Sequence, residues 1–349
     1  MEYIYYIILS IVIILSFAIK NTNSKILLIL LIVTLSLFSG LRNIDVGADT
    51  LNYYNIINNI KNGVYSPNVE YGFIVYSKII LTIFDNPTYV FLITALIINS
   101  CIITRFYLSG SKKTFPIACI WYYTFLFPQS CNIMRQYLAA AIVFLFTIFL
   151  ERKSYRIFII AVLAATTIHL SAIISLLLIP INILFSRDFK RREKKKLAIA
   201  LLLAIPIIAI YVSFSVEHYK SYLLSSANNK IGVLNIIRLA IAFFYIITNQ
   251  SNFTHIKHCG FCKVKNSNLV PITLCYVIGI VFTSFGYYFT TMARLGLLYM
   301  FFEPIFVSEV STFSKNRNLY RILYSILYIM YFILNVGSGW SGLSNYSFI

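Results

Sequence analysis

Charged residues are scarce in this sequence, and acidic residues are the scarcest of them. Only 11% of the 349 residues are charged, against about 25% in an ordinary soluble domain. So few charges cannot cover the surface of a soluble chain of this size, which excludes a soluble enzyme, a disordered chain and a disulfide-stapled secreted domain. The hydrophobic share of 59% and the mean hydropathy of +0.81 predict a polytopic membrane protein.

Nucleotide-binding motifs are also missing. The sequence contains no Walker motif and no G-x-G-x-x-G, so nothing in it points to ATP hydrolysis or to a redox cofactor. We expect no cofactor. One string, 255–262, holds two histidines and two cysteines of the types that bind zinc. His258 directly precedes Cys259, however, which makes joint tetrahedral ligation awkward, so we expect no metal either.

Long apolar runs repeat along the whole chain, and a spanning helix needs about 20 such residues. We therefore predict an all-α transmembrane helix bundle with about 10–12 spanning helices, plus short re-entrant or interfacial helices, in a single integral membrane domain over 1–349. The candidate runs are 3–19, 26–41, 88–104, 115–127, 137–150, 197–216, 236–248, 269–285, 295–311 and 319–337.

Basic residues outnumber acidic ones by 29 to 11, and their positions predict the orientation of the helices. Short cytoplasmic loops are rich in Lys and Arg. Six clusters that hold 21 of the 29 basic residues satisfy this rule if they are all cytoplasmic. The largest is the basic cytoplasmic loop 186–196, which serves as a topology anchor or contacts anionic lipid headgroups. No nucleic-acid partner is expected, because this placement accounts for most of the basic excess.

That placement leaves two irregular segments. Residues 42–87 form an outer loop with an interfacial or re-entrant helix over 71–84, and 157–185 becomes a pair of short helices broken near His169. Non-helical backbone at membrane depth is tolerated only where it lines a cavity or is buried in protein. We therefore expect a cavity that faces outward.

The first candidate site follows the run 26–41 directly. Arg42 suits capture of phosphate oxygens by paired hydrogen bonds. Asp49 can take a proton from an attacking sugar hydroxyl. Asp49 or Thr50 also fits as the cap of the next helix, and capping and catalysis do not exclude each other.

Two more candidates lie where apolar runs are interrupted. Arg135 and Gln136 end a polar stretch just before the run 137–150, and an arginine at that depth faces a partner or a cavity, or reaches back to the interface. His169 lies at the break in 157–185, as a functional group or as a packed, hydrogen-bonded side chain.

The remaining candidates are single charges at segment ends. Arg294, at the outer end of a run, can hold a phosphate. Glu303 lies within that run, where a structural ion pair with a buried base is the alternative to function. Glu70 precedes 71–84, either as a second candidate base or as an ordinary acidic residue at a helix N-terminus.

Taken in order, these stretches resemble the EpsG family of bacterial exopolysaccharide proteins, which is grouped with the Wzy-type O-antigen polymerases. The tail from Trp340 to Ile349 carries only a weak echo of the family pattern, and the loop 249–268 is no part of it. The matching stretches are Gly40 to Tyr53, Glu70-Tyr71-Gly72, Asn132-x-x-Arg135-Gln136-x-Leu138-Ala139, Ala164 to Ala172, and Arg294 with the hydrophobic run after it.

The resemblance implies a GT-C-like, metal-independent glycosyltransferase, a multi-pass protein of the bacterial cytoplasmic (inner) membrane. It would join oligosaccharide repeat units on undecaprenyl pyrophosphate at the outer face, for O-antigen, capsule or exopolysaccharide. A chain-length regulator and a flippase would be its membrane partners. The implied catalytic residues are Asp49, His169 and Arg135, and the implied substrate-binding residues are Arg42, Glu70, Gln136 and Arg294.

Two other functions fit the same residues. A flippase or transporter for a lipid-linked oligosaccharide would use the arginines for binding alone, but we find no internal repeat of the kind that transporters show. A membrane acyltransferase that modifies the polysaccharide would use His169, but it would have less need of an arginine-rich outer face.

Overall fold

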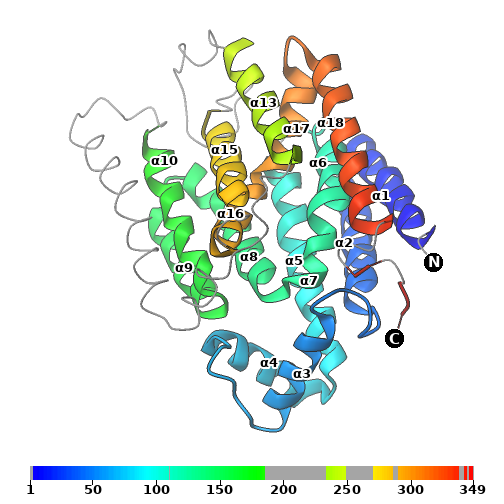
Figure 1. Ribbon diagram of the computed structural model, residues 1–349, viewed down its shortest axis with the longest axis vertical. Helices are drawn as coiled ribbons and strands as arrows, with labels where there is room; N and C mark the ends of the chain where they lie inside the picture. The colour runs from blue at the N-terminus through cyan, green and yellow to red at the C-terminus, as the bar shows by residue number, and fades with distance from the viewer. Residues whose placement is uncertain are drawn as a thin grey trace. The chain divides into compact units, whose positions relative to one another are not determined.

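The computed structural model describes residues 3–109, 111–184, 233–248, 270–285, 290–337, 342–343 and 346–348. Within these residues the chain is all-helical, as predicted, and its only extended pairing is an isolated antiparallel bridge between Arg42 and Phe348 (Figure 1).

The described helices run along the chain from residue 3 to residue 337. In chain order they are α1 (Tyr3–Thr22), α2 (Lys25–Gly40), α3 (Thr50–Lys61), α4 (Tyr71–Phe84), α5 (Pro87–Ser109), α6 (Phe115–Trp121), the π-helix η1 (Tyr122–Leu126), α7 (Phe127–Asn132), α8 (Met134–Glu151), α9 (Tyr155–Ile168), the 3₁₀-helix η2 (Leu170–Leu177), α10 (Leu178–Leu184), α13 (Val233–Thr248), α15 (Val270–Phe285), α16 (Thr290–Met300), α17 (Phe302–Phe313), α18 (Arg317–Phe332) and the π-helix η3 (Ile333–Gly337).

Three helices among the described residues are long and apolar enough to cross a membrane by themselves, namely α1, α5 and α8. The pair α16 and α17, bent by 43° at a short break, makes a fourth candidate. Six further apolar helices of 10–17 residues include α2, α4 and α9. The chain is therefore a helical membrane protein. The predicted run 197–216 and the basic loop 186–196 lie outside the described residues.

The two segments predicted to be irregular contain the expected helix and the expected break, and the interfacial or re-entrant placement of 71–84 remains a prediction. The helix expected over 71–84 is α4, with those bounds. The segment 157–185 breaks at His169, because α9 ends at Ile168 and the 3₁₀-helix η2 begins at Leu170. The short run 115–127 continues to Asn132 through a π-helical turn, a feature that often marks functional sites.

The chain divides into two compact units. The first comprises residues 1–145, 167–169 and 307–349, and the second comprises 146–166 and 170–306. In the first unit α2 and α5 cross closely at Gly40, where a Cβ atom would lie 2.6 Å from the backbone of Leu92. In the second unit Gly279 and Gly296 give α15 and α16 the same close approach. Small residues at helix crossings are the usual packing device inside membranes.

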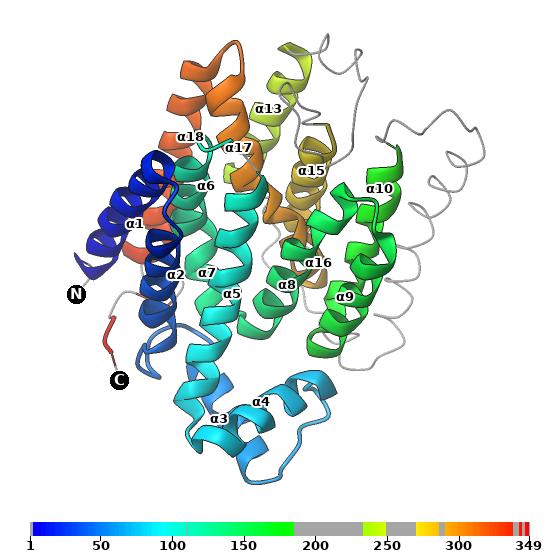
Figure 2. The same ribbon diagram turned by 180° about the vertical axis from the view of Figure 1, so that it is seen from behind.

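Helices α3 and α4 form a small lobe of the first unit, and they lie side by side beyond one end of α5 (Figures 1 and 2). Its core includes Tyr53, Ile57, Phe73 and Phe91. Lys61 at the end of α3 pairs with the exposed Asp85 that caps α4, with 2.8 Å between Nζ and Oδ1. We call residues 42–87 the α3–α4 lobe.

Candidate functional site

An ion pair links the α3–α4 lobe to the start of α8. Glu70 occupies the N-cap position of α4, but its side chain makes no capping hydrogen bond. Instead its Oε2 lies 2.6 Å from Nη1 of Arg135, which also donates to the carbonyl of Asn68 at 3.3 Å. The side chains of Arg135 and Glu70 are 16% and 19% exposed, so the pair is open to a ligand on one side.

His169 joins this pair through the break between α9 and η2. Its Nδ1 lies 4.0 Å from Oε1 of Glu70, and the side chain is buried. Gly72 makes the approach feasible, because a Cβ atom there would lie 2.6 Å from the carbonyl oxygen of Thr167. The Glu70-Tyr71-Gly72 motif therefore places a carboxylate beside His169 and leaves room for the backbone that carries the histidine.

Tyr53 extends the group on the other side of Arg135. The centre of its ring lies 5.9 Å from the Arg135 guanidinium carbon. Burial raises the pKa of the Tyr53 hydroxyl, the Arg135 charge and hydrogen bonding oppose that rise, and the Asp49 carboxylate adds to it. The Tyr53 hydroxyl is thus neutral at physiological pH, and it interacts electrostatically with both Asp49 and Arg135. Sequence reasoning noted Tyr53 without giving it a role.

Asp49 stands at the N-cap of α3, as one of the two sequence interpretations requires. Its side chain makes no capping hydrogen bond, and within the described part of the chain its carboxylate forms no ion pair. Asp49 is half-buried. Five groups then follow one another, and we call them the polar row: Asp49, Tyr53, Arg135, Glu70 and His169.

Arg42 has a different environment from Arg135. It is 4% exposed, and its Nη2 donates to the carbonyl of Cys131 at 2.6 Å. Its Nη1 donates to the carbonyl of Ser39, and its Nε donates to the Thr50 hydroxyl at 3.1 Å. Ser39 and Cys131 lie in the last turns of α2 and α7, where carbonyls lack helical partners. Arg42 therefore caps two helix C-termini and ties both to the start of α3, a placement that the helix dipole also favours.

The two most specific sequence motifs meet beside this arginine. Gly47 has φ +97°, and a Cβ atom there would lie 2.8 Å from Oδ1 of Asn132. A residue with a side chain would be strained at this φ and would clash with Asn132. The loop 42–49 is thus folded against the end of α7, directly before Arg135.

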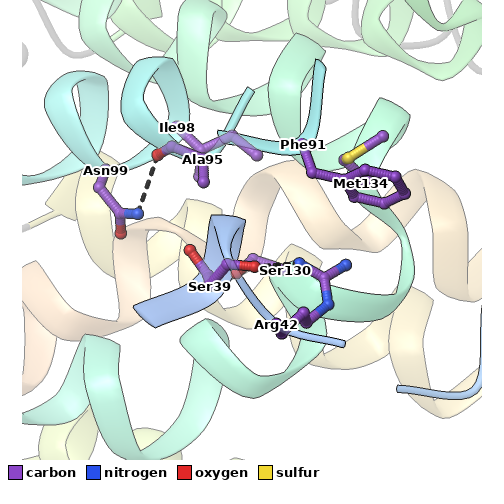
Figure 3. A pocket seen from close by; sticks show the side chains of 8 residues that line it. All are labelled: Ser39, Arg42, Phe91, Ala95, Ile98, Asn99, Ser130 and Met134. Carbon is purple, nitrogen blue, oxygen red and sulfur yellow. Dashed lines mark hydrogen bonds between the residues drawn. The ribbon is translucent and has the colours of Figure 1, made fainter. Parts of the chain in front are cut away.

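A small pocket lies next to Arg42 among α2, α5 and α7. Figure 3 shows its side chains, with the Asn99 amide hydrogen-bonded to the Ala95 carbonyl at 2.9 Å. The polar residues that line it are Ser39, Arg42, Asn99 and Ser130. Buried Arg42 therefore borders a pocket that is lined in part by polar side chains.

The other predicted residues lie elsewhere. Gln136 is buried on α8, one residue after Arg135. Arg294 is half-buried on α16, in the second unit. Glu303 is fully buried and forms a paired contact with Arg238, with 2.9 Å between Nε and Oε1. This confirms the structural ion pair that was one interpretation of Glu303.

The string 255–262 lies outside the described residues. In the part of the chain that the structure describes, no group of three or more His, Cys, Asp or Glu side chains is arranged to hold a metal ion. The predictions of no metal and no cofactor remain predictions.

Comparison of the sequence with protein families gives one match, to the model of the EpsG family over residues 25–348. The chain belongs to the EpsG family. Membership makes it a membrane protein of polysaccharide biosynthesis with a polymerase-type, glycosyltransferase-like activity. No curated protein and no solved structure matches the chain. Three of the motifs that first indicated the family, those that contain Arg42, Glu70 and Arg135, come together in the first unit.

Proposed function

We propose that this EpsG-family protein polymerises oligosaccharide repeat units carried on undecaprenyl pyrophosphate, at the outer face of the bacterial inner membrane. The polar row is the observation that carries the proposal. It combines Asp49, a carboxylate that forms no ion pair with the residues that the structure describes, with a partly exposed arginine, Arg135. Glycosyl transfer from a lipid pyrophosphate needs these two functions, a proton acceptor and a positive charge at the leaving group.

In the proposed reaction the acceptor hydroxyl oxygen bonds to the anomeric carbon of the donor sugar. The bond from that carbon to the pyrophosphate oxygen breaks, and its electron pair leaves with the pyrophosphate. The hydroxyl proton passes to Asp49. Arg135 faces the negative charge that develops on the leaving group and stabilises the transition state. The pyrophosphate leaving group supplies the driving force, so neither a nucleotide nor a metal ion takes part.

Glu70 and His169 complete the site around Arg135. The 2.6 Å contact with Glu70 fixes the guanidinium while its Nε atom has no hydrogen-bond partner among the described residues. The exposed part of the Arg135 side chain is the part that can meet a phosphate oxygen. His169 is the alternative base for the acceptor hydroxyl, and its position 4.0 Å from Glu70 lets the carboxylate stabilise its protonated form.

The remaining predicted residues take supporting roles in this proposal. Arg42 directs its donors at protein acceptors, so we assign it to positioning: it holds the loop that carries Asp49. Gln136 and Arg294 are proposed substrate contacts. The overall architecture is proposed to be GT-C-like. A flippase and a chain-length regulator are the proposed partners in the same membrane.

Deletion of the gene, followed by electrophoresis of the surface glycan and of the lipid-linked intermediates, tests this function. We expect the ladder of chain lengths to collapse to one repeat unit on the outer face. Accumulation of repeat units on the cytoplasmic side would identify a flippase instead. A full ladder that has lost only acyl groups would identify an acyltransferase.

A further inference from the structure

The loop 42–49 is held from the far end of the sequence. The backbone N–H of Asn43 donates to the carbonyl of Ser347 at 2.8 Å, and the N–H of Gly47 donates to the carbonyl of Gly342 at 2.9 Å. An isolated antiparallel bridge pairs Arg42 with Phe348. Gly342, Ser347 and Phe348 thus contact both ends of the loop, and we call residues 342–343 and 346–348 the tail segment.

Aromatic packing fixes the tail segment to α2. The Tyr346 ring stacks on Phe38, with 4.4 Å between the ring centres, and its hydroxyl donates to the Phe38 carbonyl. Tyr5 of α1 meets the edge of the same ring at 5.5 Å. Tyr346 is buried, so this contact anchors the segment between two helices of the first unit.

Gly342 brings the tail segment against the residues that precede Asp49. Its φ is +69°, and a Cβ atom there would lie 2.8 Å from the backbone nitrogen of Ala48 and 3.1 Å from the carbonyl carbon of Gly47. A side chain at 342 would be strained by this φ and would push on the loop one residue before Asp49.

We propose that the tail segment is a positioning element of the active site: it holds the loop 42–49 so that Asp49 remains beside Tyr53. This inference rests on the proposed function of Asp49. It gives residues 342–348 a role that their weak resemblance to the family pattern does not indicate. The elements that it joins are some 300 residues apart in the sequence.

Charge placement agrees with the side of the membrane that this requires. Helix α18 begins at Arg317, within a basic cluster that the Lys and Arg bias places in the cytoplasm. Helix α2 begins at Lys25, in another such cluster. For α2, one of the shorter apolar helices, this bias predicts an outer C-terminal end, and that is the end where the loop 42–49 and the tail segment meet.

A disulfide tests the geometry without using activity. Asn43 and Ser347 are opposite each other in an antiparallel pairing, at a spacing that a disulfide can bridge. We expect Asn43→Cys with Ser347→Cys to form a disulfide spontaneously in intact cells, because the outer compartment is oxidising. Asn43→Cys with Lys61→Cys is the control and should remain reduced. Failure of the first pair to oxidise would overturn the inference.

Activity tests the positioning role. Gly342→Ala should cut the amount of long-chain glycan at least tenfold. In that variant the disulfide between positions 43 and 347 should restore the long-chain glycan, whereas either cysteine alone should not. Gly63→Ala is the matched control, because Gly63 also has a positive φ, +76°, but nothing lies within 4 Å of the added Cβ. It should leave the glycan unchanged.

Two outcomes separate this inference from the proposed function. If Gly342→Ala makes a wild-type glycan while Asp49→Asn makes only one repeat unit, the positioning role is wrong and the polymerase function still holds. A wild-type glycan from both would overturn the proposed function. If Gly342→Ala is missing from the membrane, Tyr346→Phe, which removes only the hydroxyl contact with Phe38, must shorten the glycan for the inference to hold.

Discussion

Two arginine–glutamate pairs, one in each unit, show how differently the same residue types can be used. Arg238 and Glu303 are 2% and 0% exposed, and Arg238 also donates to Asn235 at 2.8 Å and contacts the sulfur of Met300. Arg135 and Glu70 are 16% and 19% exposed and share a single contact of 2.6 Å. The first pair is closed on all sides, whereas the second keeps part of its charge available.

This difference shows that the exposure and the contacts of a buried ion pair must be known before the pair can be assigned a function. Breaking a closed pair is strongly destabilising, because removal of either partner leaves the other as an uncompensated buried charge. An open pair that borders a carboxylate, a tyrosine and a histidine has the parts needed for group transfer.

The largest effect should come from Asp49→Asn. The change keeps the size of the side chain and removes the base, so polymerisation should fall by about 10²–10⁴-fold. Protein levels should be unchanged, since the carboxylate makes no capping bond that would be lost. The ladder of lipid-linked glycan and an immunoblot of the same membranes measure both. A normal ladder would assign the proton transfer to His169, which His169→Ala then tests.

Glu303→Gln should act on stability and leave the chemistry intact. Removing one charge of a fully buried pair costs about 3–5 kcal/mol. The purified protein should therefore unfold at a lower temperature, and less of it should accumulate in the membrane. Glycan made per molecule should match the wild type. A variant that is stable but makes only single repeat units would place Glu303 in the site.

Gly72→Ala should disturb the open pair without touching a charge. The new Cβ would lie 2.6 Å from the carbonyl oxygen of Thr167, so α4 or the His169 segment must shift. A displacement of this size at a catalytic group costs up to about 10²-fold in rate. The distribution of chain lengths at matched protein level is the readout. An unchanged distribution would show that His169 need not lie beside Glu70.

The smallest effect should come from Lys61→Ala. Its ion pair with Asp85 lies in the same lobe, but Asp85 is exposed, and exposed pairs contribute about 0–1 kcal/mol. Glycan length and thermal stability should both stay near wild-type values. A collapsed ladder here would mean that any charge change in the α3–α4 lobe stops the reaction, which would remove the special status of Arg135.

Much of the fold could be predicted from the sequence because it depends on local patterns. The apolar run 71–84 is α4, and the break expected near His169 lies at that residue. The charges assigned to loops predicted the positions of residues less well. Arg105 counted as a cytoplasmic loop residue, yet it is buried on α5, 5.8 Å from the ring of Phe144. Its helix extends to Ser109, beyond the apolar run that predicted its end.

The site was predictable only in part, because its contacts join distant residues. Sequence spacing cannot show that Arg42 points at the carbonyls ending α2 and α7, so its type alone favoured phosphate binding. Tyr53 had no signal beyond its place after Asp49. The sequence signal for the tail segment was even weaker, because its contacts with the loop depend on tertiary packing across nearly the whole chain.

The direct comparison of Arg135→Ala with Glu303→Gln tests the central claim, that the open pair serves the reaction and the closed pair serves the fold. The measurement is the lipid-linked glycan made per molecule of membrane-inserted protein in each strain. We predict one repeat unit for Arg135→Ala, a loss of about 10²-fold or more, and a full ladder for Glu303→Gln. A full ladder from Arg135→Ala at normal protein level would contradict the account.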